Sequence, residues 1–136
     1  MPSGAAAAGA VTLAADTTVT VDGKILGKPA DATEAMDMLR SLSGRTHQVF
    51  TAVAVIANDQ LNEVLQRSQV RFAEISEATL KAYCATQEPY DKAGSYGVQG
   101  LAAQFIEHIS GSYTGIMGLP LFETSRLLKQ AGIRML

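Results

Sequence analysis

Three short polar motifs stand out in this sequence because they set acids, lysines and amides beside apolar or glycine-rich segments. The first is Asp16-Thr17, which follows the apolar residues of LAADTTV. A carboxylate at the end of an apolar strand is costly to bury unless it has a partner or a metal ion. Ligands also gather at the carboxyl ends of strands in α/β folds. Asp16 is therefore a candidate metal ligand or general base, and the alternative is a capped turn at the end of the strand.

The second motif, Gly27-Lys28-Pro29, precedes a predicted helix start. A lysine at this place, with the free N–H groups of a helix behind it, makes a local anion site that would suit phosphate. The segment lacks the GxxxxGK[ST] spacing of a P-loop. A solvated loop lysine is the alternative interpretation of Lys28.

The third motif is the loop EPYDKAGSYGVQG, which spans residues 88–100 and is the densest polar segment of the chain. Glu88, Asp91 and Lys92 lie within five positions of one another, and three glycines allow the backbone to approach a ligand closely. Gln99 could recognise a base edge because its amide carries both donors and an acceptor. A purely structural loop rarely needs acid, base, amide and three glycines together, so the pattern favours a functional site.

The composition sets limits on the function. The chain has 136 residues, enough for one domain, and its 47% hydrophobic and 18% charged residues exclude disorder of the whole chain. With 11 Lys and Arg against 13 Asp and Glu, the net charge is −2 and no basic block occurs. This balance is a poor match for a general nucleic-acid or membrane-surface binder.

The cysteine and histidine content is low. A single cysteine, Cys84, excludes an intramolecular disulfide framework and fits a reducing cytoplasm, where we expect it to be a small core residue. The two histidines lack the spacing of a histidine metal site, and we expect His47 to be a hydrogen-bonded structural residue. No apolar run approaches the ~20 residues of a membrane span, and the start lacks the basic residues of a secretory signal.

Strand and helix patterns are mixed along the chain, which predicts the α/β class with a mixed sheet flanked by helices. We expect a disordered small-residue tail over residues 1–10 and a single domain over residues 11–136. The predicted strands cover residues 11–21, 24–26, 47–57, 61–75 and 101–109. The predicted helices cover residues 31–43, 76–85 and 118–131.

Local signals mark several of these bounds. Asp22-Gly23 predicts a hairpin turn between the first two strands. Asp31 and Glu34 have the spacing of a capping box, and Gly44 is a plausible C-terminal stop for the same helix. In the last helix, three leucines are expected to face the core: Leu121, Leu127 and Leu128.

Taken in order, the motifs resemble those of one family. They are ADT, GKP, H-x-V-x-TAV, EPYDKAGSYGVQG, FI-x-x-I-x-GSY and GLPLFET, and together they resemble the Maf-type nucleotide pyrophosphatases, also labelled septum-formation inhibitor-like. The resemblance runs from about Leu13 to Ile133. It implies a hydrolase dependent on a divalent metal, Mg²⁺ or Mn²⁺, that cleaves nucleoside triphosphates to a nucleoside monophosphate and pyrophosphate. It also implies a two-lobed α/β fold with a cleft, in a protein that commonly forms homodimers.

The resemblance also implies roles for individual residues. Asp16 would accept a proton from the attacking water and bind the metal, and Lys28 and Lys92 would bind phosphates. Thr17 and Gln99 fall where the subfamily acting on dTTP and UTP carries its specificity residues. The implied substrates are dTTP, UTP and modified pyrimidine triphosphates, which would make the protein a cytoplasmic house-cleaning enzyme.

Two further residues of the long loop, Glu88 and Asp91, are candidates for a supporting role in the same site. The chain departs from the family pattern at its start, because no S-x-SPRR string occurs and MPSGAAAAGAV precedes Leu13. Arginines of that string would grip the triphosphate through bidentate contacts that lysines replace poorly. We therefore expect a Maf-like domain that is truncated at its N-terminus. The alternative function is a catalytically inactive module that binds a nucleotide or a protein partner, linked to cell division as the family label suggests.

Overall fold

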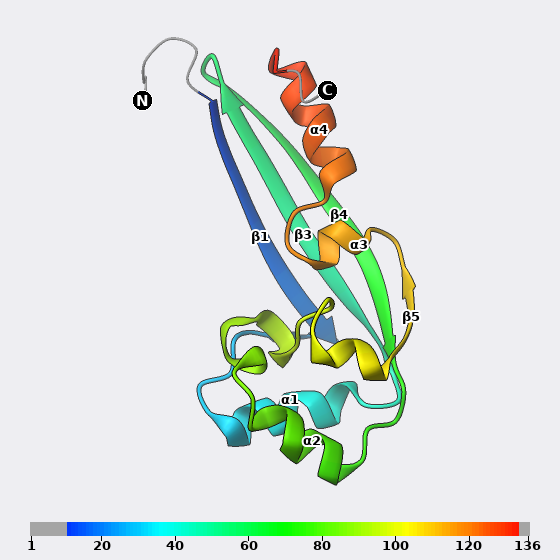
Figure 1. Cartoon of the computed structure of the whole chain (residues 1–136). Helices are drawn as coiled ribbons and strands as arrows, with labels where there is room; N and C mark the ends of the chain where they lie inside the picture. Colours follow the sequence, from blue (N-terminus) through cyan, green and yellow to red (C-terminus); the bar gives the residue numbers. More distant parts are fainter. Residues whose placement is uncertain (1–10, 134–136) are drawn as a thin grey trace.

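A computed structural model describes residues 11–133, in which a long twisted sheet is flanked by helices (Figure 1). The sheet order is β2-β1-β3-β4-β5. The strands are β1 (Val11–Val21), β2 (Lys24–Leu26), β3 (Thr46–Ala57), β4 (Gln60–Phe72) and β5 (Ile106–Ser110). The helices are α1 (Ala32–Leu42), α2 (Glu77–Cys84), α3 (Tyr113–Ile116) and α4 (Leu121–Gln130).

The α/β class with a sheet flanked by helices is confirmed. One feature is corrected, since each strand pairing within residues 11–133 is antiparallel and the sheet is not mixed in direction. Short turns join β1 to β2 and β3 to β4 as antiparallel neighbours, whereas longer segments that contain helices connect β2 to β3 and β4 to β5. The tail predicted over residues 1–10 lies outside the described residues.

Tight turns build two hairpins, β1–β2 at the edge of the sheet and β3–β4 within it. Asp22 and Gly23, with φ of 51° and 75°, connect β1 to β2, and Asn58 and Asp59, with φ of 52° and 61°, connect β3 to β4. Two consecutive residues with positive φ give the twist that matches two antiparallel strands. The predicted turn at Asp22-Gly23 is confirmed, and the β3–β4 hairpin makes the two longest strands of the sheet neighbours.

The capping signals of α1 act as predicted. The Glu34 N–H donates to Asp31 Oδ1 at 2.9 Å, and the Ala30 N–H donates to Glu34 Oε1 at 3.0 Å. These bonds satisfy N–H groups at the helix start that have no partner within the helix. At the other end, Gly44 with φ of 67° turns the chain back toward β3.

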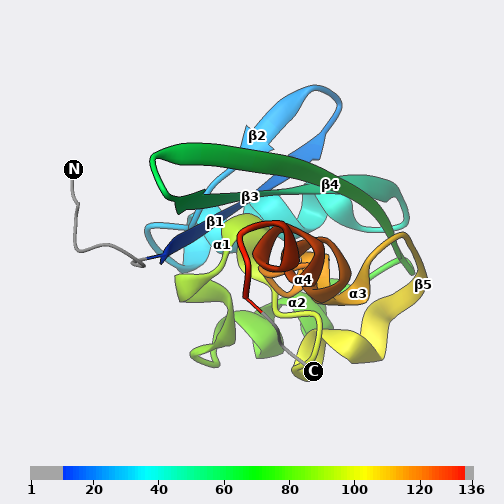
Figure 2. The same cartoon turned by 90° about the horizontal axis from the view of Figure 1, so that it is seen from above.

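The hydrophobic residues form two separate cores, one at each end of the sheet. The larger core lies among α1, α2 and the lower ends of the strands, around Leu39, Leu42 and Phe72. The smaller core lies beneath α4, where Leu127 packs on Val53 and Val55 of β3. This division gives the two-lobed shape of Figure 1, and Figure 2 shows α4 lying on one face of the sheet.

Two local predictions are wrong. The segment predicted as a strand over residues 101–109 starts as a 3-10 helix, Leu101–Phe105, and becomes β5 at Ile106. Ala102 and Phe105 are its buried residues, and their spacing of three matches a 3-10 turn. Leu121, predicted to face the core, is 49% exposed because the inner side of α4 carries Thr124 and Leu127 instead. No helix within residues 11–133 has the length and apolar character needed to cross a bilayer.

Candidate active site

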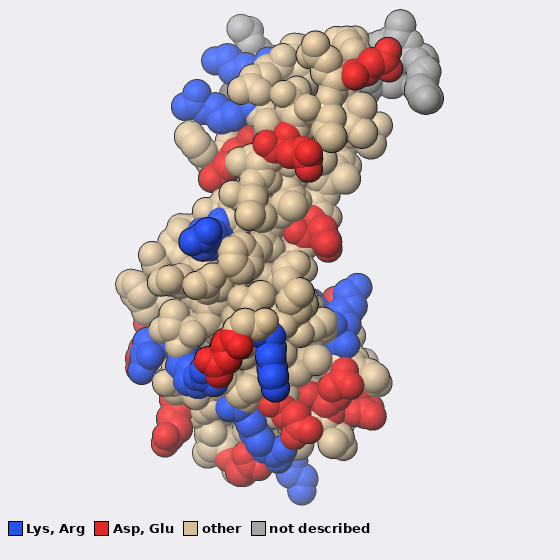
Figure 3. All heavy atoms as spheres, turned by 180° about the vertical axis from the view of Figure 1, so that it is seen from behind, with Lys and Arg blue, Asp and Glu red and all other residues tan. Residues whose placement is uncertain are grey.

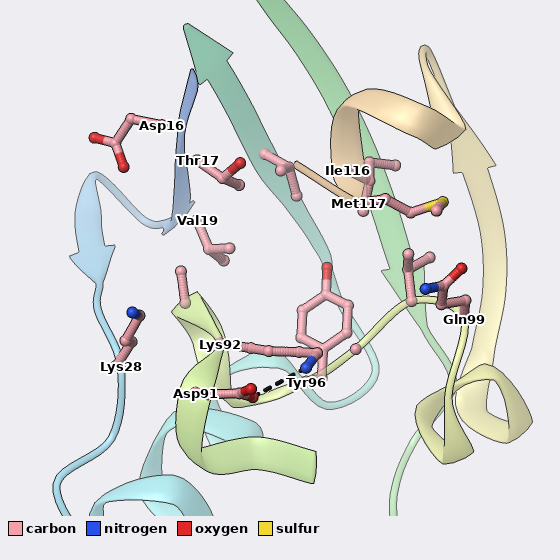
Figure 4. Close-up of a pocket in the computed structure, with 14 residues that line it drawn as sticks. Asp16, Thr17, Val19, Lys28, Asp91, Lys92, Tyr96, Gln99, Ile116 and Met117 are labelled. Carbon is pink, nitrogen blue, oxygen red and sulfur yellow. Dashed lines mark hydrogen bonds and ion pairs between the residues drawn. The ribbon is translucent and has the colours of Figure 1, made fainter. Parts of the chain in front are cut away.

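A pocket of about 360 Å³ lies beside the middle of β1, where the two lobes meet. It is lined by side chains from β1, the segment after β2, the loop of residues 88–100 and the short helix α3 (Figure 4). Six of the predicted site residues lie around it: Asp16, Thr17, Lys28, Asp91, Lys92 and Gln99. Residues far apart in the sequence thus share one cavity that a small molecule could enter.

Asp16 and Thr17 reach the pocket from opposite faces of β1. Side chains alternate along a strand, and Figure 4 shows the Asp16 carboxylate pointing away from the Thr17 hydroxyl. β2 pairs with β1 only from Val19 to Val21. Among residues 11–133, the edge of β1 that faces β2 therefore has no paired strand at Asp16, and the exposed carboxylate can meet a ligand and water.

The two lysines flank the same side of the pocket. Their segments are tied together, since the Gly94 N–H donates to the Gly27 carbonyl at 3.1 Å. Gly94 has φ of 76°, and a Cβ there would lie 2.9 Å from Val19 Cγ1, so only glycine lets the loop sit this close to β1. This close contact brings the backbone beside Lys92 next to the segment that carries Lys28.

Lys92 already has an acidic partner. Its Nζ lies 2.9 Å from Asp91 Oδ1, and this hydrogen bond holds the pKa of Asp91 below its usual range. Both side chains are exposed to solvent, so the pair contributes little to stability and can rearrange. A phosphate group could therefore compete with Asp91 for the lysine ammonium.

Glu88, the first residue of the loop, is not among the residues that line the pocket. Its carboxylate accepts hydrogen bonds from the backbone N–H groups of Leu101, at 2.8 Å, and Ala102, at 3.2 Å, and from the Tyr83 hydroxyl. Burial opposes ionisation of Glu88, but these hydrogen bonds outweigh it and lower its pKa. Glu88 thus anchors the two ends of the loop to each other, and its supporting role in the site stays a prediction.

The far wall of the pocket contains residues that the sequence analysis did not single out. Ile116 is the last residue of α3 and Met117 is its C-cap, and their side chains lie opposite Thr17 in Figure 4. Behind Thr17, the buried Thr51 of β3 donates a hydrogen bond to the Gly115 carbonyl at 2.6 Å. The sequence signal that could have predicted α3 is Ser112, a preferred N-cap residue. Its side chain caps the helix by accepting a hydrogen bond from the Gly115 N–H.

A buried pair supports the floor of the pocket. His47 Nε2 lies 2.7 Å from the Tyr96 hydroxyl, and Tyr96 lines the cavity. Burial lowers the pKa of His47 to about 4, so the imidazole is neutral at neutral pH. The prediction of His47 as a hydrogen-bonded structural residue is confirmed, and so is that of Cys84, which is buried in the larger core.

No three His, Cys, Asp or Glu side chains in the described part of the chain gather closely enough to hold a metal ion. The pocket still offers carboxylate oxygens, from Asp16 and Asp91. Mg²⁺ is usually bound through one or two carboxylates together with phosphates of the substrate. The donor set therefore fits a divalent cation that is shared with a phosphorylated ligand.

Comparison with known proteins agrees with the geometry. Residues 3–131 match the family described as Maf-like protein. The chain is 56% identical over 124 residues to a nucleoside triphosphate pyrophosphatase of Haemophilus ducreyi, covering 91% of this chain and 63% of that protein. It is 57% identical over 121 residues to a dTTP/UTP pyrophosphatase of Bordetella parapertussis, covering 89% and 58%.

A dTTP/UTP pyrophosphatase of Ralstonia nicotianae gives the same result, with 57% identity over 122 residues, 89% of this chain and 59% of that protein. The chain thus spans about three fifths of the length of the curated relatives it matches. The family match covers nearly all of the sequence, including each segment that lines the pocket. The chain therefore belongs to the Maf family.

Proposed function

We propose that the protein is a nucleoside triphosphate pyrophosphatase that hydrolyses dTTP, UTP and modified pyrimidine triphosphates to the monophosphate and pyrophosphate. The observation that carries this proposal is that one pocket brings together groups suited to phosphate and groups suited to a base. Asp16 and Lys28 lie at one side, Gln99 lies at the other, and the side chains of Thr17 and Lys92 extend between them (Figure 4). The acid and the lysines suit a triphosphate, and the hydroxyl and the amide suit a base. The names of the relatives support the same activity.

In this proposal Asp16 is the general base. Its exposed carboxylate takes a proton from a water molecule, whose oxygen forms a bond to the α-phosphorus while the bond from that phosphorus to the bridging oxygen breaks. Pyrophosphate then leaves with the electron pair of the broken bond. A base in such a position contributes roughly 10²–10⁴-fold to the rate.

The lysines neutralise the charge that the phosphates carry into the pocket. Lys28 and Lys92 are point charges on flexible stems, so they attract phosphate without fixing its orientation as arginines would. Mg²⁺ or Mn²⁺ held by Asp16 and the substrate would supply further neutralisation of the phosphate oxygens. Because nucleoside triphosphates are its substrates, we propose that the protein acts in the cytoplasm.

We also propose that the protein forms a homodimer through the sheet face opposite α4. This outer face carries Leu65 opposite Ala52, and Leu61 opposite Ile56. Leu65 is 60% exposed and lies between two exposed charged residues of opposite sign on the same face, Glu63 and Arg67. A two-fold axis at Leu65 would set Glu63 of each copy against Arg67 of the other, so the face is complementary to itself.

The test of the activity is pyrophosphate release from dTTP and UTP with Mg²⁺ or Mn²⁺, measured for the natural chain and for Asp16→Asn. We expect the substitution to reduce kcat by roughly 10²–10⁴-fold, because Asn cannot accept the proton. Asp59→Asn is the matched control, since Asp59 is an exposed turn residue outside the pocket. Equal rates for the natural chain and Asp16→Asn would contradict the proposal. Nucleotide binding without turnover would favour the inactive binding module.

A further inference from the structure

Thr51 lies directly behind the part of the pocket assigned to the base. It is 1% exposed and pairs across the sheet with Thr17, so the two side chains lie on the same face of neighbouring strands. The Thr51 hydroxyl oxygen lies 2.6 Å from the Gly115 carbonyl oxygen and 3.1 Å from Thr17 Oγ1. Thr51 therefore connects a pocket side chain to the backbone of α3.

These two contacts determine which hydroxyl donates. A carbonyl oxygen can only accept, and a hydroxyl carries one hydrogen, so the hydrogen of Thr51 is used on Gly115. In the contact between the two threonines, Thr51 must then be the acceptor and Thr17 the donor. The Gly115 carbonyl also accepts the Gly118 N–H at 3.0 Å, so both of its lone pairs are engaged and the arrangement is fixed.

The consequence for a ligand is that Thr17 can offer only lone pairs. A hydroxyl that rotates freely serves as donor or acceptor and would not discriminate between bases. Gln99, across the pocket, has the same freedom because its amide carries both kinds of group. Of Thr17 and Gln99, only Thr17 is therefore restricted to one hydrogen-bonding role toward a ligand. That role is acceptor, which suits a ligand atom that donates a hydrogen bond.

We propose that Thr51 is a positioning residue that holds Thr17 as an acceptor, so that the site selects bases with a ring N–H donor. This inference rests on the proposed function and specifies its base preference. Uracil and thymine carry an N–H at the imide nitrogen, whereas cytosine has an acceptor lone pair at the same ring position. An acceptor held against that lone pair leaves both unsatisfied, which corresponds to a loss of affinity on the order of tenfold to a hundredfold.

The test uses the affinities of the α,β-methylene analogues of UTP and CTP, measured by calorimetry, because binding does not depend on turnover. The natural chain should bind the uracil analogue at least tenfold more tightly. Thr51→Val keeps the branched shape and removes the hydroxyl, so Thr17 can turn its hydrogen toward the pocket. The ratio of the two affinities should then fall toward one, mainly through tighter binding of the cytosine analogue.

Thr51→Ser keeps the hydroxyl and should preserve the ratio of the two affinities. If Thr51 acted only through the packing of its methyl group, Thr51→Ser would not be expected to behave like the natural chain. Thr18→Val is the matched control, because Thr18 is a neighbouring threonine on the opposite face of β1. An unchanged ratio in Thr51→Val, or no preference in the natural chain, would overturn the inference. Hydrolysis of UTP without any preference over CTP would leave the proposed function standing and reject the inference alone. Failure to bind either analogue would reject both.

Discussion

At the scale of single residues, the buried His47 couples the stability of the protein to pH. Its Nδ1 is buried without a hydrogen-bond partner in the described part of the chain, and Nε2 is bonded to Tyr96. Protonation would place an N–H at Nδ1 with nothing to accept it. Burial accordingly lowers the pKa of His47 from 6.5 to about 4.

This shift predicts a loss of stability in weak acid. The unfolded chain binds the proton near pH 6.5 and the folded chain only near pH 4, so folding is favoured above this range and weakened as pH falls through it. The free energy of unfolding should drop by about 3 kcal/mol over that range. Urea unfolding between pH 7 and 4 measures the drop. His47→Gln should remove most of it, whereas His108→Gln, at an exposed position, should keep it.

The site was predictable from sequence where its chemistry resides in motifs. Asp16-Thr17, Lys28 and the loop of residues 88–100 could be recognised because acids, lysines and glycines mark these segments, and the structure sets six of the predicted side chains around one pocket. Thr51 could not be recognised in this way. Its role depends on the register of β1 against β3 and on a carbonyl 64 positions further along the chain, and neither is visible in a local pattern.

At the scale of elements, the loop of residues 88–100 depends on the contact between Glu88 and Gly100. A Cβ on Gly100 would lie 2.0 Å from Glu88 Oε1, so Gly100→Ala must displace the carboxylate from the N–H groups of Leu101 and Ala102. We expect a loss of roughly 1–3 kcal/mol in unfolding free energy, because hydrogen bonds from two backbone N–H groups to a charged carboxylate are lost. Gly27→Ala is the control, since nothing lies within 4 Å of a Cβ there.

A double-mutant cycle separates this contact from a general loss of loop freedom. If Glu88 is the obstacle, adding Gly100→Ala to Glu88→Ala should cost far less than adding it to the natural chain. Because Gln99 is next to Gly100, Gly100→Ala should also raise KM for UTP. Equal costs of Gly100→Ala in both backgrounds would show that the clash is not with the carboxylate.

Sequence signals located the elements well wherever a local contact decides the structure. The Asp22-Gly23 turn and the capping box of α1 are contained in a few consecutive residues, and both occur as predicted. The segment after Gly100 differs, because alternating apolar residues there satisfy either a strand or a short helix. Glu88, thirteen and fourteen positions earlier, favours the helix by accepting the N–H groups of Leu101 and Ala102.

At the scale of the whole molecule, the two-lobed shape leaves a long sheet whose faces are covered unequally. α4 covers the face that carries Val53 and Val55, while the outer face carries the exposed Leu61 and Leu65. Figure 3 shows the molecule from behind, with charged side chains scattered over the narrower part rather than gathered there. Exposed apolar side chains that lie together on one face are typical of an interface between proteins.

The proposed homodimer makes this outer face the test of assembly. Leu65→Lys puts a charge at the centre of the interface, where it would meet its own copy across the two-fold axis, so we expect it to weaken self-association by at least tenfold. Sedimentation velocity over a range of protein concentrations measures the change. Ile25→Lys is the matched control, because Ile25 is 72% exposed and lies on β2, outside the outer face of β3 and β4.

Exchanging the charges with Glu63→Arg and Arg67→Glu together should preserve the dimer, since each copy would still present opposite charges to the other. A natural chain that stays monomeric at high concentration would contradict the proposal, and so would a dimer that Leu65→Lys leaves intact.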